Sequence, residues 1–537
     1  MNCFVVGVDV GTGSARAGVF DLQGRMLAVA KRSLDMHRSD AGHAEQSSAQ
    51  IWQAVCESVI DAVAQSGVSP NDIAGIGFDA TCSLVVIGAK QGVGDLDHSE
   101  RDIIVWSDHR ATEQAARINA QGHAVLDHVG GRISPEMQTP KLLWLKENRP
   151  HVFDRADHFF DLSDFLTWKA SGSTARSTCT VTCKWTYLAH ENRWDDGYFR
   201  QIGLGELVDD GFVRIGIQIV PAGTPLADGL TQDAASAMGL RAGTAVAAGL
   251  IDAHAGGIGT VGASGGFGDA RRTMAYVFGT SSCTMTSSTT AQFVPGVWGP
   301  YYSAMVPGLW LNEGGQSAAG AALDQLVASH PASAEAADLA RSAGLGVTQW
   351  LADRALELAP DLAVHLAANL HVVPEYQGNR APFADPANRA VVAGLGLQQG
   401  VDSLVALYVA GLCGLAYGLR QIIAAQAEAG VIVDAISVSG GAGGHPLSRQ
   451  IIADATGLPV EVTHSPEPVL LGSAMLGAVA ANLFKDVAQA MPCMSSVAHQ
   501  HQPDAKVLNL HARRYDAFCR LQSTAREIRL LDNSATD

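Results

Sequence analysis

The chain opens, at residues 4–21, with the stretch FVVGVDVGTGSARAGVFD. Residues 3–10 are rich in β-branched residues, residues 11–14 have the Gly-Thr-Gly-Ser composition of a tight turn, and residues 15–21 are apolar again. A further turn leads to a third strand-like run at residues 25–31. The stretch therefore predicts three consecutive antiparallel strands, so the fold begins as a meander.

Helix and strand signals alternate along the rest of the chain, which predicts a mixed α/β fold. The strand, glycine turn and strand of the N-terminus return at residues 273–287. Two related halves are therefore expected. The predicted helices are 48–65, 111–121, 402–429 and 447–456, and the predicted strands are 73–79, 103–106, 244–251, 273–278, 283–287 and 435–439.

The repeated pattern predicts a domain boundary near residue 260. We expect an N-terminal domain at residues 1–260, a C-terminal domain at residues 261–490 and an extension at residues 491–537. The polar segment 495–504 should be poorly ordered, and residues 532–537 should fray.

Composition limits the classes of partner. Of the 537 residues, 47% are hydrophobic and 17% charged, and the formal net charge is −17, which disfavours nucleic acid and anionic membranes as partners. Nine scattered cysteines without a Cys-x-x-Cys pair predict a reduced cytoplasmic protein without structural zinc. The N-terminus lacks the positively charged segment with which a secretory signal begins. The uncharged run 403–419 is shorter than a membrane span, and we expect a core helix there.

Three glycine turns follow apolar strands, at residues 9–14, 279–281 and 440–444. Glycines let backbone N–H groups approach phosphate oxygens, although each turn alone is better explained as a hairpin that requires positive φ. Their symmetric placement favours nucleotide binding. The chain has no Walker-type phosphate loop, and the Gly-x-Gly-x-x-Gly of residues 257–262 lacks the strand and acidic residue of a dinucleotide site. We interpret it as a chance match.

Aspartates at strand ends are the second signal, because ligands gather at the carboxyl ends of strands in α/β folds. Asp9 lies beside a phosphate-type turn, where a carboxylate makes sense if Mg²⁺ lies between it and phosphate. Asp79, Asp108 and Asp252 each follow a predicted strand, and helix capping is the alternative role for each. Asp252 stands out because only apolar and small residues precede it for ten positions.

Two further segments have ambiguous roles. Residues 176–188 surround Lys184 and Trp185, a pair that suits a polyol, although a surface strand with an exposed lysine is the more common explanation. Cys179 and Cys183 have no second pair, so we predict no metal there. The polar clusters 313–316 and 375–380 could line a cleft or cap one.

Together these residues resemble the FGGY family of carbohydrate kinases, within the actin-like ATPase superfamily, from about residue 4 to about residue 484. The resemblance to the D-ribulokinase branch rests on the strings GFDATCS (77–83), WSDHRA (106–111), GGRISPEMQTPKLLWL (130–145) and CKWTY (183–187). It implies two actin-like, ribonuclease-H-like α/β domains with a cleft between them. The first would bind mainly the sugar and the second mainly ATP, with closure of the cleft on binding.

The resemblance also assigns roles residue by residue. Asp252 matches the catalytic base. His445 departs from the asparagine common in the family, so the contacts to adenine are less defined. The implied ATP-binding residues are Gly11, Thr12, Gly13, Ser14 and Arg16 of the first turn, Gly279 and Thr280 of the second, and Gly440, Gly441, Ala442 and His445 of the third; the implied sugar-binding residues are Asp79, Ala80, Lys184, Asp252 and Glu313; the metal-binding residue is Asp9.

The expected function is an ATP:pentulose phosphotransferase in which Asp252 accepts the proton of the C5 hydroxyl of D-ribulose, with ATP and Mg²⁺ as cofactors. The alternatives are a kinase for ribitol, L-ribulose or D-xylulose, a chaperone-like or filament-forming actin-like ATPase, and, third, an NAD-dependent dehydrogenase. We expect a cytoplasmic homodimer whose partners are sugar and ATP, not nucleic acid or membrane.

Overall fold

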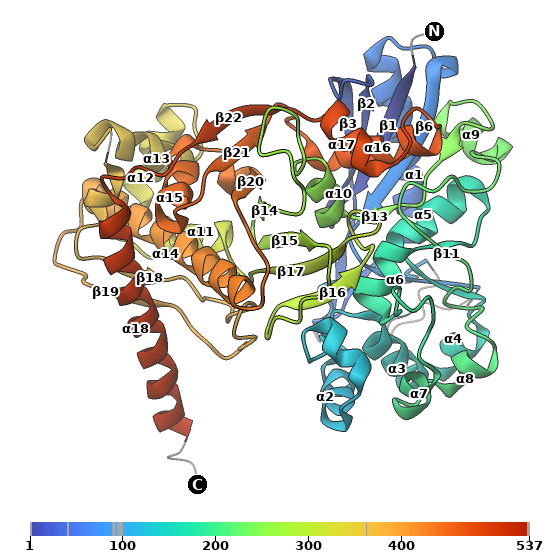
Figure 1. The fold of residues 1–537 in the computed structure, drawn as a ribbon, viewed down its shortest axis with the longest axis horizontal. Helices are drawn as coiled ribbons and strands as arrows, with labels where there is room; N and C mark the ends of the chain where they lie inside the picture. The colour runs from blue at the N-terminus through green and yellow to red at the C-terminus, as the bar shows by residue number, and fades with distance from the viewer. Residues whose placement is uncertain (1–2, 40–41, 89–92, 94–99, 361, 534–537) are drawn as a thin grey trace.

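The computed structural model describes residues 3–39, 42–88, 93, 100–360 and 362–533. Two lobes lie side by side, each built on its own β-sheet (Figure 1). The first lobe contains the N-terminal half of the chain, in blue to green, and the second contains most of the C-terminal half.

The sheet of the first lobe confirms the predicted meander. Strand β1 (Phe4–Val10) pairs antiparallel with β2 (Ser14–Phe20), and β2 pairs antiparallel with β3 (Met26–Ser33). On its other edge β1 pairs parallel with β6 (Ile73–Ala80), in a register that places Asp9 opposite Asp79. Two aspartates therefore lie side by side at the carboxyl end of the sheet.

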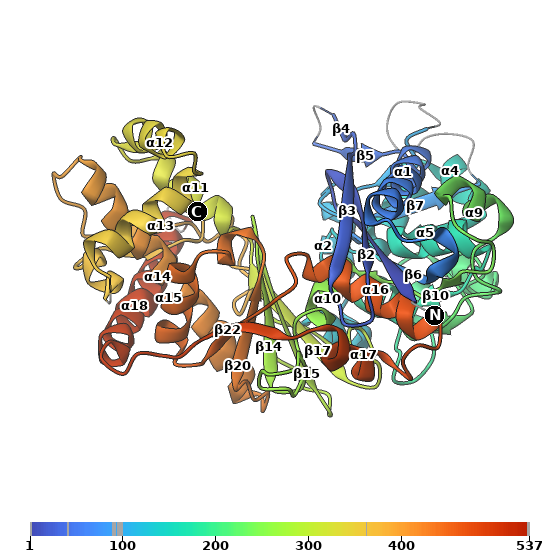
Figure 2. The same ribbon diagram turned by 90° about the horizontal axis from the view of Figure 1, so that it is seen from above.

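Two helices cover the faces of this sheet. Helix α1 (Ser48–Ser66) begins with the Ser47 side chain as its cap, ends at Gly67 as predicted, and packs on β2 and β3. The opposite face is covered by α16 (Pro468–Ala480), although this helix comes from the C-terminal half of the chain. Figure 2 shows α16, in orange, against the blue strands.

Glycines make the close contact between α16 and the sheet possible. A Cβ at Gly7 would lie 2.0 Å from the carbonyl oxygen of Leu470, and one at Gly77 would lie 1.9 Å from that of Ser473. The helix therefore rests directly on the strand backbones, and only glycine fits beneath it.

The sheet of the second lobe repeats the arrangement of the first. Strand β14 (Thr273–Phe278) pairs antiparallel with β15 (Ser282–Ser288) and parallel with β20 (Ala435–Ser439). These pairings confirm the predicted return of the opening pattern. The remaining strands are β16 (Trp298–Tyr302), β17 (Trp310–Gln316), β21 (Val460–Thr463) and β22 (Val497–His501), in the order β16-β17-β15-β14-β20-β21-β22.

Helix α14 (Val401–Glu428) is the central helix of the second lobe. It is long and apolar enough to cross a membrane by composition, but 72% of its most apolar window is buried inside the protein. The structure thus supports the predicted core helix. The other helices of this lobe are α11 (Gly320–Ala328), α12 (Ser333–Ser342), α13 (Val347–Leu358), α15 (Pro446–Thr456) and α18 (Leu508–Asn533).

The structure corrects several predicted elements. The strand predicted at 244–251 is two short strands, β12 (Ala245–Val246) and β13 (Leu250–Ile251), because between them Ala248 bonds with the backbone of residues 223 and 224 instead of β6. The segment 495–504 is not disordered, since β22 pairs with β21. Residues 103–106 give only the two-residue strand β8 (Ile103–Ile104). Of the predicted fraying end, residues 534–537 lie outside the described residues.

A smaller sheet, in the order β4-β5-β8-β7-β9, and short helices complete the first lobe. These elements are β4 (His37–Arg38), β5 (Ala44–Gln46), β7 (Leu84–Ile87), β9 (His158–Asp161), α2 (Thr112–Gln121), α3 (Gln138–Asn148), α4 (Pro150–Arg155), α5 (Leu162–Ser171), α6 (Thr178–Trp185), α7 (Asp196–Gln201), α8 (Gly205–Asp209), α9 (Gln232–Met238) and α10 (Asp252–Ile258).

Candidate active site

Two cavities meet at the second glycine turn. The first, of about 310 Å³, is lined by residues of both lobes, among them Asp9, Lys184, Asp252 and Glu313. The second, of about 580 Å³, lies in the second lobe. Gly279 and Thr280 line both cavities, so a molecule in one can reach a molecule in the other at this turn. The lining of the second cavity is Gly279, Thr280, Gly320, Leu323, Asp324, Thr348, Gln349, Tyr408, Gly441, Ala442, Gly444 and His445.

The glycines of the first two turns are not required by backbone conformation. Both turns are hairpins, since each joins two antiparallel strands, but Gly11, Gly13 and Gly279 do not have positive φ, so the expected requirement for positive φ is wrong at these glycines. A Cβ at Gly279 would approach nothing closer than the Ser281 carbonyl oxygen, at 3.6 Å. Their small size therefore leaves open space beside the backbone of the turn, as a phosphate-binding loop requires.

The third turn differs from the other two. Gly440 has φ of 89°, and a Cβ there would lie 2.6 Å from the Phe278 carbonyl oxygen, so this glycine is required by the fold. Gly441 and Ala442 line the second cavity, whereas Gly440 does not. In the first turn Gly11, Thr12 and Arg16 line the first cavity, and Gly13 and Ser14 do not.

Three aspartates meet at the carboxyl end of the first sheet. Asp9 is buried and forms an ion pair with Arg16, whose other nitrogen donates to Glu467 at 2.7 Å. Asp79 is fully buried, accepts a 2.5 Å hydrogen bond from Ser473, and has one oxygen with no hydrogen-bond partner among the residues that the structure describes. Burial, and then the charge of Asp9, raise the pKa of Asp79 well above its usual range.

Asp252 opens α10, where its side chain accepts a 2.7 Å hydrogen bond from the N–H of Ala253. It is the first residue of the helix, not the capping residue, and it lines the first cavity. Burial and the charge of Asp9 raise the pKa of Asp252 to about 6. A carboxylate with this pKa is suited to accept a proton near neutral pH.

Asp79 and Ala80, both predicted to contact sugar, lie behind the cavity wall and are not among its lining residues. The cavity is lined instead by the next two residues of the chain, Thr81 and Cys82. Asp79 is linked to the site by electrostatic interaction, because the charges of Asp9 and Asp252 act on its carboxyl group.

Lys184 and Glu313 form the polar end of the first cavity. The explanation of residues 176–188 as a surface strand is wrong, because Ser177 caps helix α6 and Lys184 is buried at its end. The Lys184 ammonium lies 4.6 Å from the centre of the Trp298 ring. Burial opposes ionisation of Glu313, but Lys184 and then His254 outweigh it and lower the pKa of Glu313 to about 2.

Several lining residues were not predicted. Trp298 comes from the second lobe, and Glu136 and Trp106 come from strings that the resemblance quoted without assigning them a role. In the cluster 375–380, Arg380 lines the cavity, whereas Glu375 is turned away and accepts from Asn379, Asn388 and Gln522. One cluster therefore both lines the cleft and supports it.

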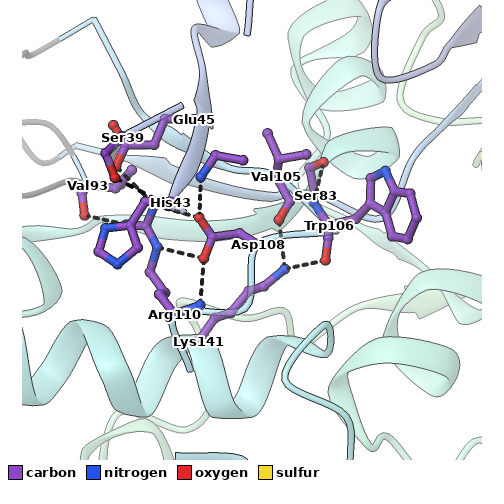
Figure 3. Close-up of polar contacts among 11 residues, drawn as sticks. Ser39, His43, Glu45, Ser83, Val93, Val105, Trp106, Asp108, Arg110 and Lys141 are labelled. Carbon is purple, nitrogen blue, oxygen red and sulfur yellow. Dashed lines mark hydrogen bonds and ion pairs between the residues drawn. The ribbon is translucent and has the colours of Figure 1, made fainter. Parts of the chain in front are cut away.

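Asp108 has a supporting role outside the cavity (Figure 3). It is fully buried, accepts from the N–H of Ala44 at 2.6 Å and pairs with Arg110. Lys141 donates to the carbonyl oxygens of Val105 and Trp106. This network holds the loop from which the Trp106 indole donates to the Thr12 hydroxyl at 2.9 Å.

His445 stands at the position where the resembled family commonly has asparagine, and its ring has two structural partners. Its Nδ1 accepts from the N–H of Leu447 and so caps α15, and its Nε2 lies 3.0 Å from Asp353. The ring also lines the second cavity. The residues 257–262 line neither cavity, and Gly259 instead allows close packing against Pro468, since a Cβ there would lie 2.0 Å from the Pro468 carbonyl oxygen.

Comparison with known proteins gives concordant matches. Models of the FGGY family of carbohydrate kinases match the chain at residues 4–259 with the N-terminal domain and at residues 274–481 with the C-terminal domain. The chain is 45% identical to an FGGY carbohydrate kinase domain-containing protein of Homo sapiens, over 98% of this chain and 97% of that protein. It is 38% identical to a D-ribulokinase of Saccharomyces cerevisiae, over 90% of this chain and 72% of that protein.

Among solved structures, a xylulose kinase of Brucella ovis superposes with a TM-score of 0.80 at 22% identity, over 98% of this chain and all of that chain. This likeness concerns the fold. With the family matches, it confirms the predicted α/β fold of two actin-like domains.

Proposed function

The chain belongs to the FGGY family of carbohydrate kinases, and from this premise we propose that it transfers the γ-phosphoryl group of ATP to the C5 hydroxyl of D-ribulose. The observation that carries the proposal is the junction of the two cavities at Gly279 and Thr280, with Asp252 in the first cavity. ATP in the second cavity would present its γ-phosphate at this junction. The sugar in the first would present a hydroxyl to Asp252.

Asp252 acts as the general base in this proposal. The C5 oxygen forms a bond to the γ-phosphorus while the bond from that phosphorus to the bridging β-oxygen breaks and ADP leaves. The hydroxyl proton goes to the Asp252 carboxylate. Closure of the lobes would exclude water, which otherwise competes with the sugar as acceptor.

Asp9 fits the divalent metal that accompanies ATP. Its carboxylate is a hard oxygen donor beside the first glycine turn. Burial, and then the charge of Asp9, raise the pKa values of Asp79 and Asp252, and a cation at Asp9 would relieve the second effect. When bound, Mg²⁺ neutralises charge on the phosphate oxygens during transfer. Arg16 holds the Asp9 carboxylate in place.

Lys184 and Glu313 support a polyhydroxylated acceptor. A buried ammonium and a buried carboxylate offer donors and acceptors that sugar hydroxyls can satisfy, and an analogue with a misdirected hydroxyl leaves them unpaired. The similarity to a yeast protein that is named a D-ribulokinase supports the choice of D-ribulose among the pentuloses as the acceptor. Ribitol, L-ribulose and D-xylulose are the alternative acceptors. Membership of a carbohydrate kinase family disfavours the chaperone, filament and dehydrogenase alternatives.

The experiment is an ADP-release assay across the 2-ketopentoses and pentitols, with the product identified by phosphorus and carbon NMR. We expect the highest kcat/KM for D-ribulose, then ribitol, which keeps the C3 and C4 configuration, and phosphate at C5. A preference for D-xylulose or glycerol, or phosphate at C1, would contradict the choice of acceptor.

A pair of variants tests whether the polar end of the cavity binds the sugar. Glu313→Gln should lower kcat/KM for D-ribulose and leave the KM for ATP nearly unchanged, because a carboxylate that accepts sugar O–H bonds becomes partly a donor. Glu375→Gln is the matched control, since Glu375 is also buried and hydrogen-bonded but does not line the cavity. Equal loss in both variants would exclude a specific role for Glu313.

Two expectations from the sequence accompany the proposal, namely a homodimer and a cytoplasmic location. Light scattering on the purified chain, with a mass of 56.1 kDa per protomer, distinguishes a dimer from a monomer.

A further inference from the structure

Two cysteines and a histidine form a buried cluster behind the sugar end of the first cavity. Cys179 and Cys183 lie one turn apart on α6, and His254 lies on α10. All three side chains are fully buried, and their sulfur and nitrogen atoms lie within 4.8 Å of one another. The sequence predicted no metal at these cysteines, because nothing in their own segment indicated that His254 would contact Cys179.

The histidine is oriented as a metal ligand. Its Nε2 lies 3.4 Å from the Glu313 carboxylate, and its Nδ1 lies 3.0 Å from the Cys179 sulfur. With Nε2–H donating to the carboxylate, Nδ1 is the nitrogen that would bind an ion beside the sulfurs. A carboxylate that fixes the outer nitrogen of a histidine is the usual second partner of a metal-bound imidazole.

Cys179 has a further polar contact. Its sulfur accepts from the N–H of Ile251 at 3.4 Å, and Ile251 directly precedes α10. The Cys179 sulfur is therefore held against the segment that carries His254.

We propose that Cys179, Cys183 and His254 bind a thiophilic divalent cation, with Zn²⁺ as the expected ion. Thiolate and imidazole ligands select Zn²⁺ over Mg²⁺, so this site would be separate from the oxygen donor Asp9. Around a tetrahedral zinc ion, bonds of about 2.1 to 2.3 Å place ligand atoms roughly 3.6 Å apart, and the three ligand atoms of the cluster lie within 4.8 Å of one another.

The position of the cluster gives the ion a structural role. Helix α6 carries Lys184, α10 carries Asp252, and Glu313 lies on β17 of the second lobe. An ion bound to α6 and α10, with His254 donating to Glu313, would fix the three polar groups of the first cavity relative to one another. The zinc site is independent of which sugar the protein phosphorylates.

The test begins with the full chain stripped of metal by a chelator and titrated anaerobically with Co²⁺, a spectroscopic substitute for Zn²⁺. We expect one equivalent to give the intense thiolate-to-cobalt charge-transfer absorption, which Co²⁺ on Asp9 alone cannot give. Zn²⁺ should displace the signal, and metal analysis of protein purified without chelator should find about one zinc per chain.

Two variants localise the signal. Cys183→Ala should lose it, while Cys413→Ala, which removes a buried free thiol from α14, should keep it. Zn²⁺ should raise the Tm of the native chain and of Cys413→Ala but not that of Cys183→Ala. Absence of thiolate-to-cobalt absorption in the native chain, or its persistence in Cys183→Ala, would overturn the proposal. If Cys183→Ala does not fold, the native titration and its zinc content decide alone.

Discussion

At the scale of single residues, three aspartates with the same side chain differ in charge pairing and protonation because their surroundings differ. Asp9 is neutralised by Arg16, and burial beside Asp9 favours the protonated form of Asp79. Asp252 faces the cavity with a pKa of about 6, so it is largely a carboxylate at neutral pH without a cationic partner in hydrogen-bond contact among the described residues. Of the three, it is the one suited to act as a base.

Replacement of Asp252 by Asn tests this assignment. The variant keeps the shape and the bond to Ala253 but has no basicity, so kcat should fall by roughly 10²- to 10⁴-fold with little change in the KM for ATP. Asp108→Asn, outside the cavity, is the control: it should change stability more than the chemical step. Near-native kcat in Asp252→Asn would remove this residue from the mechanism.

The pKa of Asp252 also predicts a pH dependence. The base works only when deprotonated, so kcat/KM for the sugar should be constant well above pH 6 and fall tenfold per pH unit below it. Initial rates from pH 4.5 to 8.5, measured by direct ADP quantification, give the profile. A flat profile across this range would show that proton transfer to Asp252 does not limit the reaction.

At the scale of elements, local patterns were predictable from the sequence and long-range ones were not. The strands around Gly11 and Gly279 follow from their own residues and turns, and all three glycine turns lie where the sequence places them. The split of the strand at 244–251 depends on residues 223 and 224, which no local pattern connects to it. Trp298 and His254 escaped prediction because only packing between distant segments brings Trp298 to the cavity and His254 to the cysteines behind it.

Helix α6 shows how burial overrides propensity. Its threonines, valine and cysteines favour a strand locally, yet the Ser177 cap starts a helix whose eight residues are all buried. Lys184 is therefore carried into the cleft instead of to the surface.

The turn at Gly279 allows a test that separates ligand binding from folding. Gly279→Val should weaken ATP binding by at least tenfold while the protein still melts cooperatively, because the added side chain enters the cavity and meets no backbone closely. Gly440→Val is the contrasting variant, since positive φ and the close Phe278 carbonyl should make it destabilising. Calorimetry with ATP and a thermal melt check both. Unchanged ATP affinity in Gly279→Val would mean that the turn does not contact phosphate.

At the scale of the whole molecule, the first lobe is completed by the other half of the chain. Between β21 and β22 the chain leaves the second lobe, lays α16 on the first sheet and returns (Figure 1). Glu467 pairs with Arg16 at the start of this helix, and Ser473 donates to Asp79. The helix therefore joins the lobes directly beside the candidate active site.

The first lobe should consequently not fold alone. Four apolar side chains of α16 (Leu470, Leu471, Met475 and Leu476) are buried, and at roughly 1.5 to 3 kcal/mol each their loss removes about 6 to 12 kcal/mol. That is comparable to the total stability of a typical domain, about 5 to 15 kcal/mol. A fragment of residues 1–260 should show no cooperative melt by circular dichroism.

A second fragment supplies the positive control. Residues 465–495 joined to residue 260 by a short flexible linker should restore the melt, because Gly259 already packs against the Pro468 backbone. A cooperative melt of residues 1–260 alone would show that the sheet does not need α16.

The late origin of α16 also sets an order of events during protein synthesis. When β6 leaves the ribosome, roughly 400 residues remain to be made before α16 exists, which takes roughly 20 to 80 s at 5 to 20 residues per second. For that time one face of the first sheet, with Gly7, Gly75 and Gly77 at its centre, has no cover. Nascent chains therefore expose an apolar strand surface, and chaperones that bind such surfaces should contact the chain until roughly its last tenth is made.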